Sequence, residues 1–233
     1  PLLVCPTNGC RFSRAPAEPA SARSAMSTES LKDGWLVHDS IGDAGEFHAS
    51  DPPPVRSATL HTVATSTLVL GSAQLVTDVN DRVARALGIE VVKRRSGGGA
   101  VLLVPGEFVW LDLVIPAGDA LWEDDIGKAM VWVGELWQRA LADIGVSGEV
   151  SDVAGGGDGR WARQVCFAGI GRGEVVVGDE SGERKVVGVS QRRTRAAARF
   201  QSLCHLRWRP ELVAALVAAP HPLATDLAAY VAT

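Results

Sequence analysis

The spacing of apolar residues changes from one part of the chain to the next, and it predicts a mixture of helices and strands. Between residues 124 and 144, apolar side chains recur every three or four positions, which is the period of an amphipathic helix. A shorter helix is predicted over residues 78–87, where Asp78 can cap its start and Gly88 can end it. Two further helices are expected near the end of the chain, over residues 210–219 and after residue 222.

Short runs of β-branched and apolar residues, bounded by glycine or proline, predict the strands. The expected strands cover residues 35–39, 61–70, 89–93, 100–104, 108–115, 165–168, 173–178 and 185–191. Residues 194–204 fit a helix or a strand, and their alanine content favours the helix. Strands and helices do not alternate strictly, so the pattern predicts an α+β (mixed α/β) fold.

Composition narrows the functional classes. The chain has 233 residues, of which 46% are apolar, so it suits one domain with a substantial core. No apolar run approaches the length of a membrane-spanning helix, and a net charge of −4 argues against nucleic-acid binding by charge alone. Four cysteines without a CxxC pair and five scattered histidines fit neither a disulfide scaffold nor a metal module, and they favour a reducing, cytoplasmic setting.

The first 30 residues differ from the rest of the chain. They are rich in proline, alanine, serine and arginine, have almost no acidic residue and show no clear period. We therefore expect residues 1–30 to be a disordered leader and residues 31–233 to form a single domain. An organellar transit peptide and a natural start at Met26 are two alternative interpretations of this segment.

The first candidate site is a glycine-rich turn after a predicted strand. It consists of Arg94, Arg95, Ser96, Gly97, Gly98 and Gly99. Successive glycines let backbone N–H groups converge on an anion, and arginine adds forked donors that suit phosphate or carboxylate. The alternative is a flexible hairpin with exposed arginines. The segment lacks the residues of a Walker loop or of a dinucleotide fingerprint.

The second candidate site is Lys185, at the start of an apolar strand that contains Gly188. A lysine at the mouth of a pocket can hold a carboxylate or phosphate, or stabilise developing charge. The alternative is an edge-strand lysine that reaches solvent and discourages aggregation.

Cysteine and glycine supply weaker candidates. Cys166 lies in an apolar segment, where a buried structural thiol is the common case, because a nucleophile needs exposure and a lowered pKa. Cys204 and His205 are adjacent in sequence, so their side chains diverge, and we interpret them as structural. Residues 155–160 are a second candidate phosphate cradle or, alternatively, a mobile loop.

Three motifs in this order resemble the lipoate–protein ligase and octanoyltransferase family, whose wider fold includes biotin–protein ligase. Residues 68–74, with Gly71 and Gln74, are similar to the family's strand followed by Gly-Ser-x-Gln. Residues 94–101 are similar to its Arg-Arg-x-x-Gly-Gly-Gly-x-Val loop, and residues 185–191 to its Lys-hydrophobic-x-Gly-x-x-Gln stretch. The resemblance covers roughly residues 35–205.

The resemblance implies a biotin/lipoate-ligase-like catalytic domain, in which a mixed sheet is flanked by helices. It implies that Lys185 contacts an activated acyl group, and it makes Lys185 and Cys166 the candidate catalytic residues. The residues implied in substrate or adenylate binding are Gly71, Gln74, Arg94, Arg95, Ser96, Gly97, Gly98, Gly99, Gly188, Ser190 and Gln191. We expect an apolar tunnel walled by Val69, Val101 and Val187.

The activity that the resemblance implies is attachment of a lipoyl group to a lysine of a lipoyl carrier domain through a lipoyl-adenylate. ATP would be the co-substrate with Mg²⁺, and lipoic or octanoic acid the acyl substrate. The implied partners are the carrier domains of 2-oxoacid dehydrogenases or the glycine cleavage protein, together with acyl carrier protein. Neither nucleic acid nor a membrane is expected as a partner.

The chain also departs from the family. Leu102, Leu103 and Val104 occupy the stretch where the family usually has a histidine, often followed by aspartate. The residues after Leu206 are too few for the further C-terminal domain of family ligases, so we expect no accessory domain here. Two alternatives therefore stand beside the ligase.

One alternative is an ATP-independent octanoyl or lipoyl transferase. In one octanoyltransferase branch, a Cys-Phe segment lies upstream of the pocket lysine, and its cysteine carries the acyl group as a thioester. Cys166, Phe167 and Lys185 have a similar order here. The other alternative is a degenerate homologue that binds a ligand without catalysis.

Overall fold

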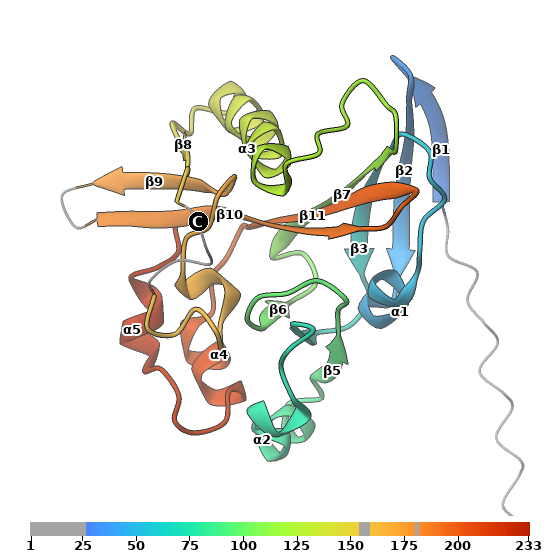
Figure 1. The fold of residues 1–233 in the computed structure, drawn as a ribbon. Helices are drawn as coiled ribbons and strands as arrows, with labels where there is room; N and C mark the ends of the chain where they lie inside the picture. Colours follow the sequence, from blue (N-terminus) through green and yellow to red (C-terminus); the bar gives the residue numbers. More distant parts are fainter. Residues whose placement is uncertain (1–26, 154–158, 180–181) are drawn as a thin grey trace, which may run out of the picture.

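The computed structural model describes residues 27–153, 159–179 and 182–233. These residues form two β-sheets with helices around them (Figure 1). Most neighbouring strands are antiparallel, but β2 (Trp35–Gly42) runs parallel to β3 (Ser57–Val63), and β4 (Thr67–Leu70) runs parallel to β5 (Glu90–Lys93). The sheets are therefore mixed, which confirms the predicted fold class.

The larger sheet has eight strands in the order β1-β2-β3-β7-β11-β10-β9-β8. Its remaining strands are β1 (Ser27–Lys32), β7 (Phe108–Pro116), β8 (Glu149–Val150), β9 (Val175–Asp179), β10 (Gly182–Arg193) and β11 (Ala197–His205). The smaller sheet has the order β5-β4-β6, with β6 at Val101–Leu103. The helices are α1 (Ala44–Ala49), α2 (Asp81–Ala86), α3 (Ile126–Asp143), α4 (Pro210–Leu216) and α5 (Ala224–Ala228), and two 3-10 turns are η1 (Val76–Asp78) and η2 (Cys166–Ala168).

The long helix α3 follows from its sequence. The Asp125 side chain caps its start by accepting a hydrogen bond from the backbone N–H of Lys128. Its buried face, which includes Val133, Trp137 and Leu141, packs on the larger sheet (Figure 1). The apolar period of residues 124–144 therefore predicted the helix and most of the side that it buries, although Ile126 at its start is 60% exposed.

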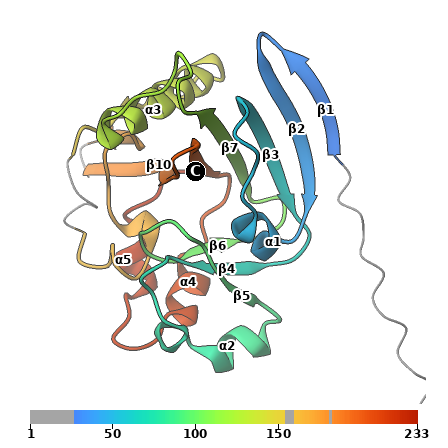
Figure 2. The same cartoon turned by 45° about the vertical axis from the view of Figure 1, so that its right-hand side comes forward.

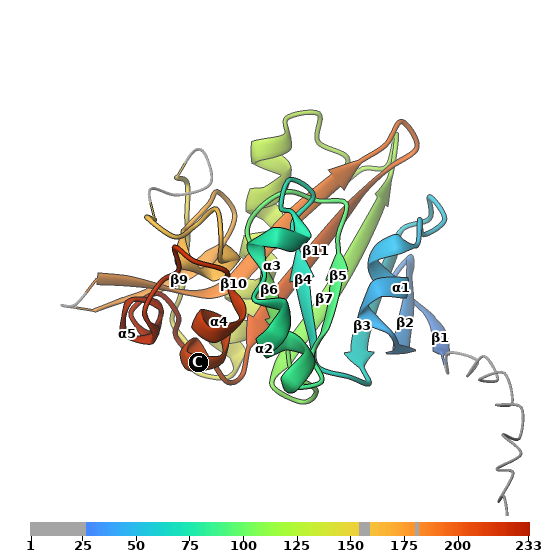
Figure 3. The same ribbon diagram turned by 90° about the horizontal axis from the view of Figure 1, so that it is seen from below.

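The other helices gather around the smaller sheet. Helix α2 contacts β5 and α4, and α5 lies beside α4 on the side away from the smaller sheet (Figure 3). Figure 2 shows β4, β5 and β6 beside the strands of the larger sheet. A cluster of buried residues joins the two sheets, and it includes Val69 and Leu103 from the smaller sheet and Trp110 and Leu203 from the larger one. This contact between the sheets is where the candidate site lies.

Three predicted elements are wrong. Residues 197–205 form strand β11 rather than a helix, because β11 lies between β7 and β10, and pairing on both sides overrides the helix propensity of alanine. Residues 166–168 form the 3-10 turn η2 rather than a strand. The predicted strand over residues 61–70 is two strands, β3 and β4, which belong to different sheets.

Two predicted boundaries also move. Helix α2 begins at Asp81 and is capped by Asn80, whereas the Asp78 carboxylate accepts a hydrogen bond from the backbone N–H of Leu75 within η1. Strand β1 begins at Ser27, so the predicted end of the leader at residue 30 falls inside a strand. Residues 1–26 lie outside the described residues, as does most of the glycine-rich stretch at 155–160. In the part of the chain that the structure describes, no helix is long and apolar enough to cross a membrane.

Candidate functional site

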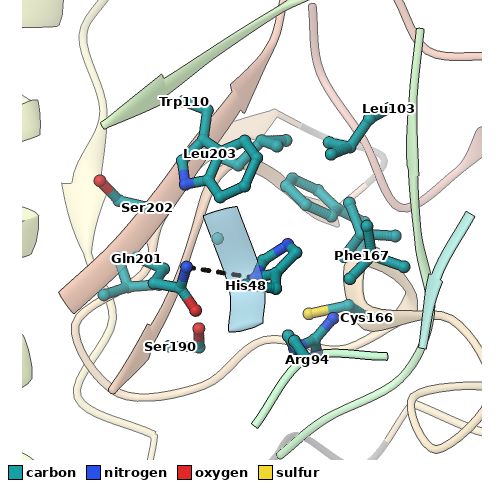
Figure 4. Close-up of a pocket in the computed structure, with 14 residues that line it drawn as sticks. His48, Arg94, Leu103, Trp110, Cys166, Phe167, Ser190, Gln201, Ser202 and Leu203 are labelled. Atoms are coloured by element: carbon teal, nitrogen blue, oxygen red, sulfur yellow. Dashed lines mark hydrogen bonds between the residues drawn. The ribbon is translucent and has the colours of Figure 1, made fainter. Parts of the chain in front are cut away.

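An inner cavity lies between the two sheets (Figure 4), with an empty volume of about 450 Å³. Val69, Val101 and Leu103 line it from the smaller sheet, and Trp110 and Leu203 line it from the larger sheet. These walls suit an apolar chain. Two of the three predicted tunnel residues lie in this lining; the third, Val187, is buried in the cluster beneath α3 instead.

An outer groove adjoins the inner cavity and has an empty volume of about 920 Å³. Gly97, Gly98 and Gly99 form one side of it, while Lys185 and Gln191 belong to the strand that forms another. Cys166, Val189 and Ser190 line both spaces, so the cavity and the groove meet at these residues. An acyl chain in the cavity can therefore present its carboxyl end at Cys166.

The thiol of Cys166 lies against the glycine turn. A Cβ atom added to Gly98, whose φ is +97°, would be 3.7 Å from Cys166 Sγ. A Cβ added to Gly99 would be 2.7 Å from the Cys166 backbone nitrogen, so glycine is needed there for the turn to pack on η2. Among the hydrogen bonds of the described residues, none uses the amides of Gly97, Gly98 or Gly99 as a donor. Because these amides have no acceptor within the described residues, they are candidate donors to an oxyanion.

Lys185 lies in the groove wall, but protein groups surround its charge. The residue is only 1% exposed, and its Nζ atom is 2.6 Å from Glu174 Oε2 and 2.9 Å from the carbonyl oxygen of Cys166. The ammonium also lies 5.2 Å from the centre of the Phe167 ring. Lys185 therefore holds the turn that carries Cys166.

The inward orientation of Lys185 has a local cause. Strand β10 lies between β9 and β11, which excludes the edge-strand interpretation. Its register with β9 shifts between Lys185 and Val187, and such a bulge redirects side chains.

Glu174 is a functional candidate that the sequence analysis missed. Burial raises the pKa of this carboxyl, although Lys185 and the N–H groups of Gly171 and Val189 favour its ionised form. The available signal was a single acidic residue before the apolar run Val175–Val177. A buried acid of this kind needs a partner, and only the fold identifies that partner as Lys185.

The two arginines of the glycine motif differ in their surroundings. Arg94 is buried, and its guanidinium donates to the carbonyl oxygens of Gly97 and Gly99, at 2.8 Å each. Arg95 is exposed and forms an ion pair with Asp51 at 2.6 Å. Hydrogen bonds from Arg192 and Arg95 lower the pKa of Asp51. Arg94 therefore shapes the turn, and Arg95 fastens it to the chain after α1.

The remaining motif residues support the same turn. Gln74 accepts a hydrogen bond from the backbone N–H of Gly71 at 2.9 Å and donates to the carbonyl oxygen of Gln164 at 3.1 Å. A Cβ on Gly71 would lie 1.8 Å from the carbonyl oxygen of Gly98, so only glycine allows this approach. Two serines complete the contact, since Ser96 Oγ and Ser190 Oγ are 3.2 Å apart. A Cβ at Gly188 would touch the Phe167 ring at 3.1 Å.

A buried polar cluster beside the inner cavity was also missed. Asp112 Oδ2 accepts hydrogen bonds from Arg199 Nε at 2.8 Å and from His61 Nε2 at 3.2 Å, and Asp112 Oδ1 accepts one from Trp110 Nε1 at 2.7 Å. Burial opposes ionisation of Asp112, but His61 and Arg199 outweigh it and lower the pKa of this carboxyl. The signal in the sequence was a charged residue inside the apolar strand at residues 108–115.

The cluster extends to the cavity through Gln201 and His48. The Gln201 amide nitrogen lies 3.2 Å from His48 Nδ1, and the His48 ring stacks on Trp110 with centroids 4.7 Å apart. Burial lowers the pKa of His48 to about 4. His48 comes from α1, whereas Leu103, from the stretch where a histidine was expected, contributes an apolar wall.

Metal binding has no support from side-chain clusters. Within the described ranges, no group of three or more histidine, cysteine, aspartate or glutamate side chains could hold a metal ion. Glu174 is the only acidic side chain among the described residues of the groove lining. Its carboxylate already forms an ion pair with Lys185.

Comparisons with known proteins identify the fold. One solved structure is a bipartite lipoate protein ligase from an archaeal lipoylation system of Thermoplasma acidophilum, studied with its E2 lipoyl domain; it is 15% identical, with a TM-score of 0.60, covering 82% of this chain and 67% of that one. Lipoate-protein ligase A bound with ATP is 14% identical, with a TM-score of 0.58, covering 79% and 69%. A T. acidophilum protein with bound lipoic acid is 13% identical, with a TM-score of 0.56, covering 79% and 69%.

No curated protein sequence matches the chain. The sequence pattern of the lipoyl protein ligase A/B catalytic domain matches residues 48–218, which is well over half of the chain and includes all three motifs. The chain therefore belongs to the lipoyl protein ligase A/B catalytic domain family.

Proposed function

We propose that this protein transfers a lipoyl or octanoyl group to a lysine side chain of a lipoyl carrier domain. The observation that carries this proposal is the position of Cys166 where the apolar cavity meets the open groove. The walls of the cavity are mostly apolar, which suits an acyl chain, and the groove can admit a donor or the acceptor lysine. The archaeal relative that was studied with its E2 lipoyl domain supports a carrier domain as the acceptor.

The contacts favour a thioester route through Cys166. The cysteine sulfur attacks the acyl carbonyl of an acyl carrier protein thioester, a new carbon–sulfur bond forms, and the carrier thiol leaves with the proton lost by Cys166. The acceptor lysine then attacks the Cys166 thioester, an amide bond forms, and the thiol is restored. We assign stabilisation of the oxyanion in both steps to the amides of Gly98 and Gly99, which donate no hydrogen bond within the described residues.

Lys185 acts in this route as a positioning residue. Its bond to the Cys166 carbonyl oxygen and its ion pair with Glu174 hold η2 against β10. A direct contact between Lys185 and the acyl group stays a prediction from the family resemblance.

An adenylate-forming ligase is the second candidate function. Its support is the size of the groove, about 920 Å³, together with the ATP and lipoic acid bound to proteins of the same fold. The groove fits Mg²⁺ poorly, because its one described carboxylate is paired with Lys185. We therefore assign no residue of this chain to the ion and place the thioester route first.

The test is the intact mass of an apo carrier domain after incubation with the protein. One arm supplies octanoyl–acyl carrier protein without ATP, and the other supplies lipoate with ATP and Mg²⁺. A mass gain from the thioester alone supports the route through Cys166. A gain of a lipoyl mass that requires ATP supports the ligase instead. If the mass does not change in either arm, both enzymatic functions are contradicted, and a homologue that binds a ligand without catalysis is favoured.

A further inference from the structure

Among the described residues, one ring nitrogen of His48 in the inner cavity has no hydrogen-bond partner, and neither has Gln201 Oε1. Arg94 donates to the glycine turn, and Ser190 pairs with Ser96. Ser202 Oγ donates to the carbonyl oxygen of Leu111 at 2.9 Å and accepts from Trp137 Nε1 at 2.8 Å. His48 is different: Nδ1 faces Gln201, whereas Nε2 has no partner among the described residues.

The surroundings of Gln201 determine which nitrogen of His48 carries the proton. The amide nitrogen of Gln201 is 3.2 Å from His48 Nδ1 and 3.5 Å from Asp112 Oδ2. An ionised carboxylate only accepts hydrogen bonds, so the donor end of the amide faces Asp112 and His48 together. His48 Nδ1 therefore accepts, and the ring proton is on Nε2.

The cluster behind Gln201 is fixed by the fold. Asp112 is 3% exposed and accepts hydrogen bonds from Trp110, His61 and Arg199. Arg199 also donates to the backbone carbonyl oxygens of Phe47 and Ser50, at 2.8 and 2.9 Å, on either side of His48. Helix α1 is thereby tied to β7 and β11, and the His48 ring is held against Trp110.

The Nε2–H group of His48 therefore faces an otherwise apolar space. In Figure 4 the ring lies among the residues that line the cavity, with one nitrogen joined to Gln201 and the second nitrogen on another side of the ring. His48 does not line the outer groove, so only a ligand that enters the inner cavity meets it. A plain alkyl chain there would expel water and leave this donor unpaired, which lowers affinity by roughly tenfold or more.

We propose that His48 makes the cavity selective for an acyl chain that carries a hydrogen-bond acceptor, over an unsubstituted alkyl chain of the same length. The inference rests on the proposed function, because it requires an acyl chain in this cavity. The acceptor has two chemical sources, a ring sulfur of a lipoyl group or a chain oxygen. An oxygen acceptor is the stronger of the two, and a hydroxyl group can also donate to Gln201 Oε1.

The test measures dissociation constants by calorimetry for lipoate, octanoate and hydroxyoctanoates with the hydroxyl group near the end of the chain. In the wild-type protein, at least one acceptor-bearing acid is expected to bind about tenfold more tightly than octanoate. In His48→Phe this ratio is expected to fall to about one, mainly because octanoate binds better. His221→Phe is the matched control, since His221 is exposed and outside the cavity.

The outcomes separate the two proposals. A wild-type ratio near one, or an unchanged ratio in His48→Phe, overturns the role of His48 while leaving acyl binding intact. Failure of every acid to bind the wild-type protein overturns this inference, whereas the proposed function is decided separately by the mass gain of the carrier domain with octanoyl–acyl carrier protein. A preference for lipoate alone or for the hydroxy acids alone supports the inference and identifies the acceptor.

A second measurement covers the case in which His48→Phe does not fold. Nitrogen-15 chemical shifts of the wild-type His48 ring are expected to show the neutral ring with its proton on Nε2. They are also expected to move with an acceptor-bearing acid more than with octanoate. A ring with its proton on Nδ1 overturns the proposal.

Discussion

The inner cavity and the outer groove are built from different kinds of residue. The groove contains the glycine turn, Lys185 and Gln191, which belong to two of the motifs. The cavity is lined largely by apolar side chains, which include the motif residues Val69 and Val101, and by His48 from α1; its polar groups are neutral except for Arg94. The motifs thus report where backbone must pack closely around the thiol of Cys166. His48, the side chain that we propose selects the acyl chain, comes from α1, and none of the three motifs contains it.

The largest expected effect comes from Cys166, which both spaces share. Cys166→Ser should lower the rate of octanoyl transfer from acyl carrier protein by about a thousandfold or more, because the nucleophile is lost. Binding of free acids in the cavity should change by less than about threefold, since the two side chains are similar in size. Initial rates measured by mass spectrometry check the expected loss of transfer, and calorimetry checks that acid binding is nearly unchanged.

Cys204→Ser is the control for a general effect of losing a thiol. Cys204 is buried, and burial raises the pKa of its thiol to about 11, so it is a poor nucleophile. Its removal should leave the transfer rate within about threefold. If Cys166→Ser transferred octanoyl from acyl carrier protein at the wild-type rate, the thioester route through Cys166 would be wrong. The adenylate-forming ligase would then be the favoured function.

The groove wall depends on the buried ion pair of Lys185 and Glu174. Lys185→Met should lower the free energy of unfolding by about 3 kcal/mol or more, because it leaves a buried carboxyl without its partner. The double variant Lys185→Met, Glu174→Gln should recover part of this loss. Urea unfolding of the single and double variants measures both effects.

An exposed ion pair gives the matched control. Arg85 and Asp81 are one helical turn apart, and the Arg85 side chain is 75% exposed. Arg85→Met should therefore cost no more than about 0.5 kcal/mol. If Lys185→Met were equally mild, the lysine would not hold η2 in place and would be free to contact substrate.

The glycine turn between the two spaces gives the next prediction. Gly71→Ala should destabilise the protein by about 3 kcal/mol, because its Cβ would meet the carbonyl oxygen of Gly98 at 1.8 Å. Gly97→Ala is the control, since a Cβ there has no atom within 4 Å, and it should cost less than about 0.5 kcal/mol. Equal thermal unfolding of both variants would contradict the close approach of the two motifs.

The sequence predicted local structure better than it predicted roles. Helix α3 follows from its apolar period because the period, the cap and the buried face are all local. Strand β11 does not, because its pairing with β7 and β10 outweighs its alanines, and no local pattern contains that pairing. Lys185 and Arg94 were found as motif residues, yet their inward contacts depend on Glu174 and on backbone carbonyls. His48 was missed because Gln201 and Asp112 are far from it in sequence.

The smallest effect concerns pH and the protonation of buried histidines. Burial lowers the pKa of both His48 and His205 to about 4, whereas the ordinary value is about 6.5. Below pH 6.5 the unfolded chain therefore binds protons that the folded protein does not, and stability falls as the pH falls towards 4. Between pH 7 and pH 5 each histidine should cost about 2 kcal/mol.

His48→Phe should remove roughly half of the pH dependence that the two histidines cause, and His221→Phe should leave it unchanged. Urea unfolding at several pH values between 7 and 5 gives the slopes for the three proteins. Phosphate-free buffers keep anions from binding the glycine turn and stabilising the fold. If His48→Phe kept the wild-type slope, His48 would accept a proton in the folded state. The His48 ring would then carry a positive charge below its pKa. The polar groups of the cavity, apart from Arg94, would no longer all be neutral, and this difference from the groove would be lost.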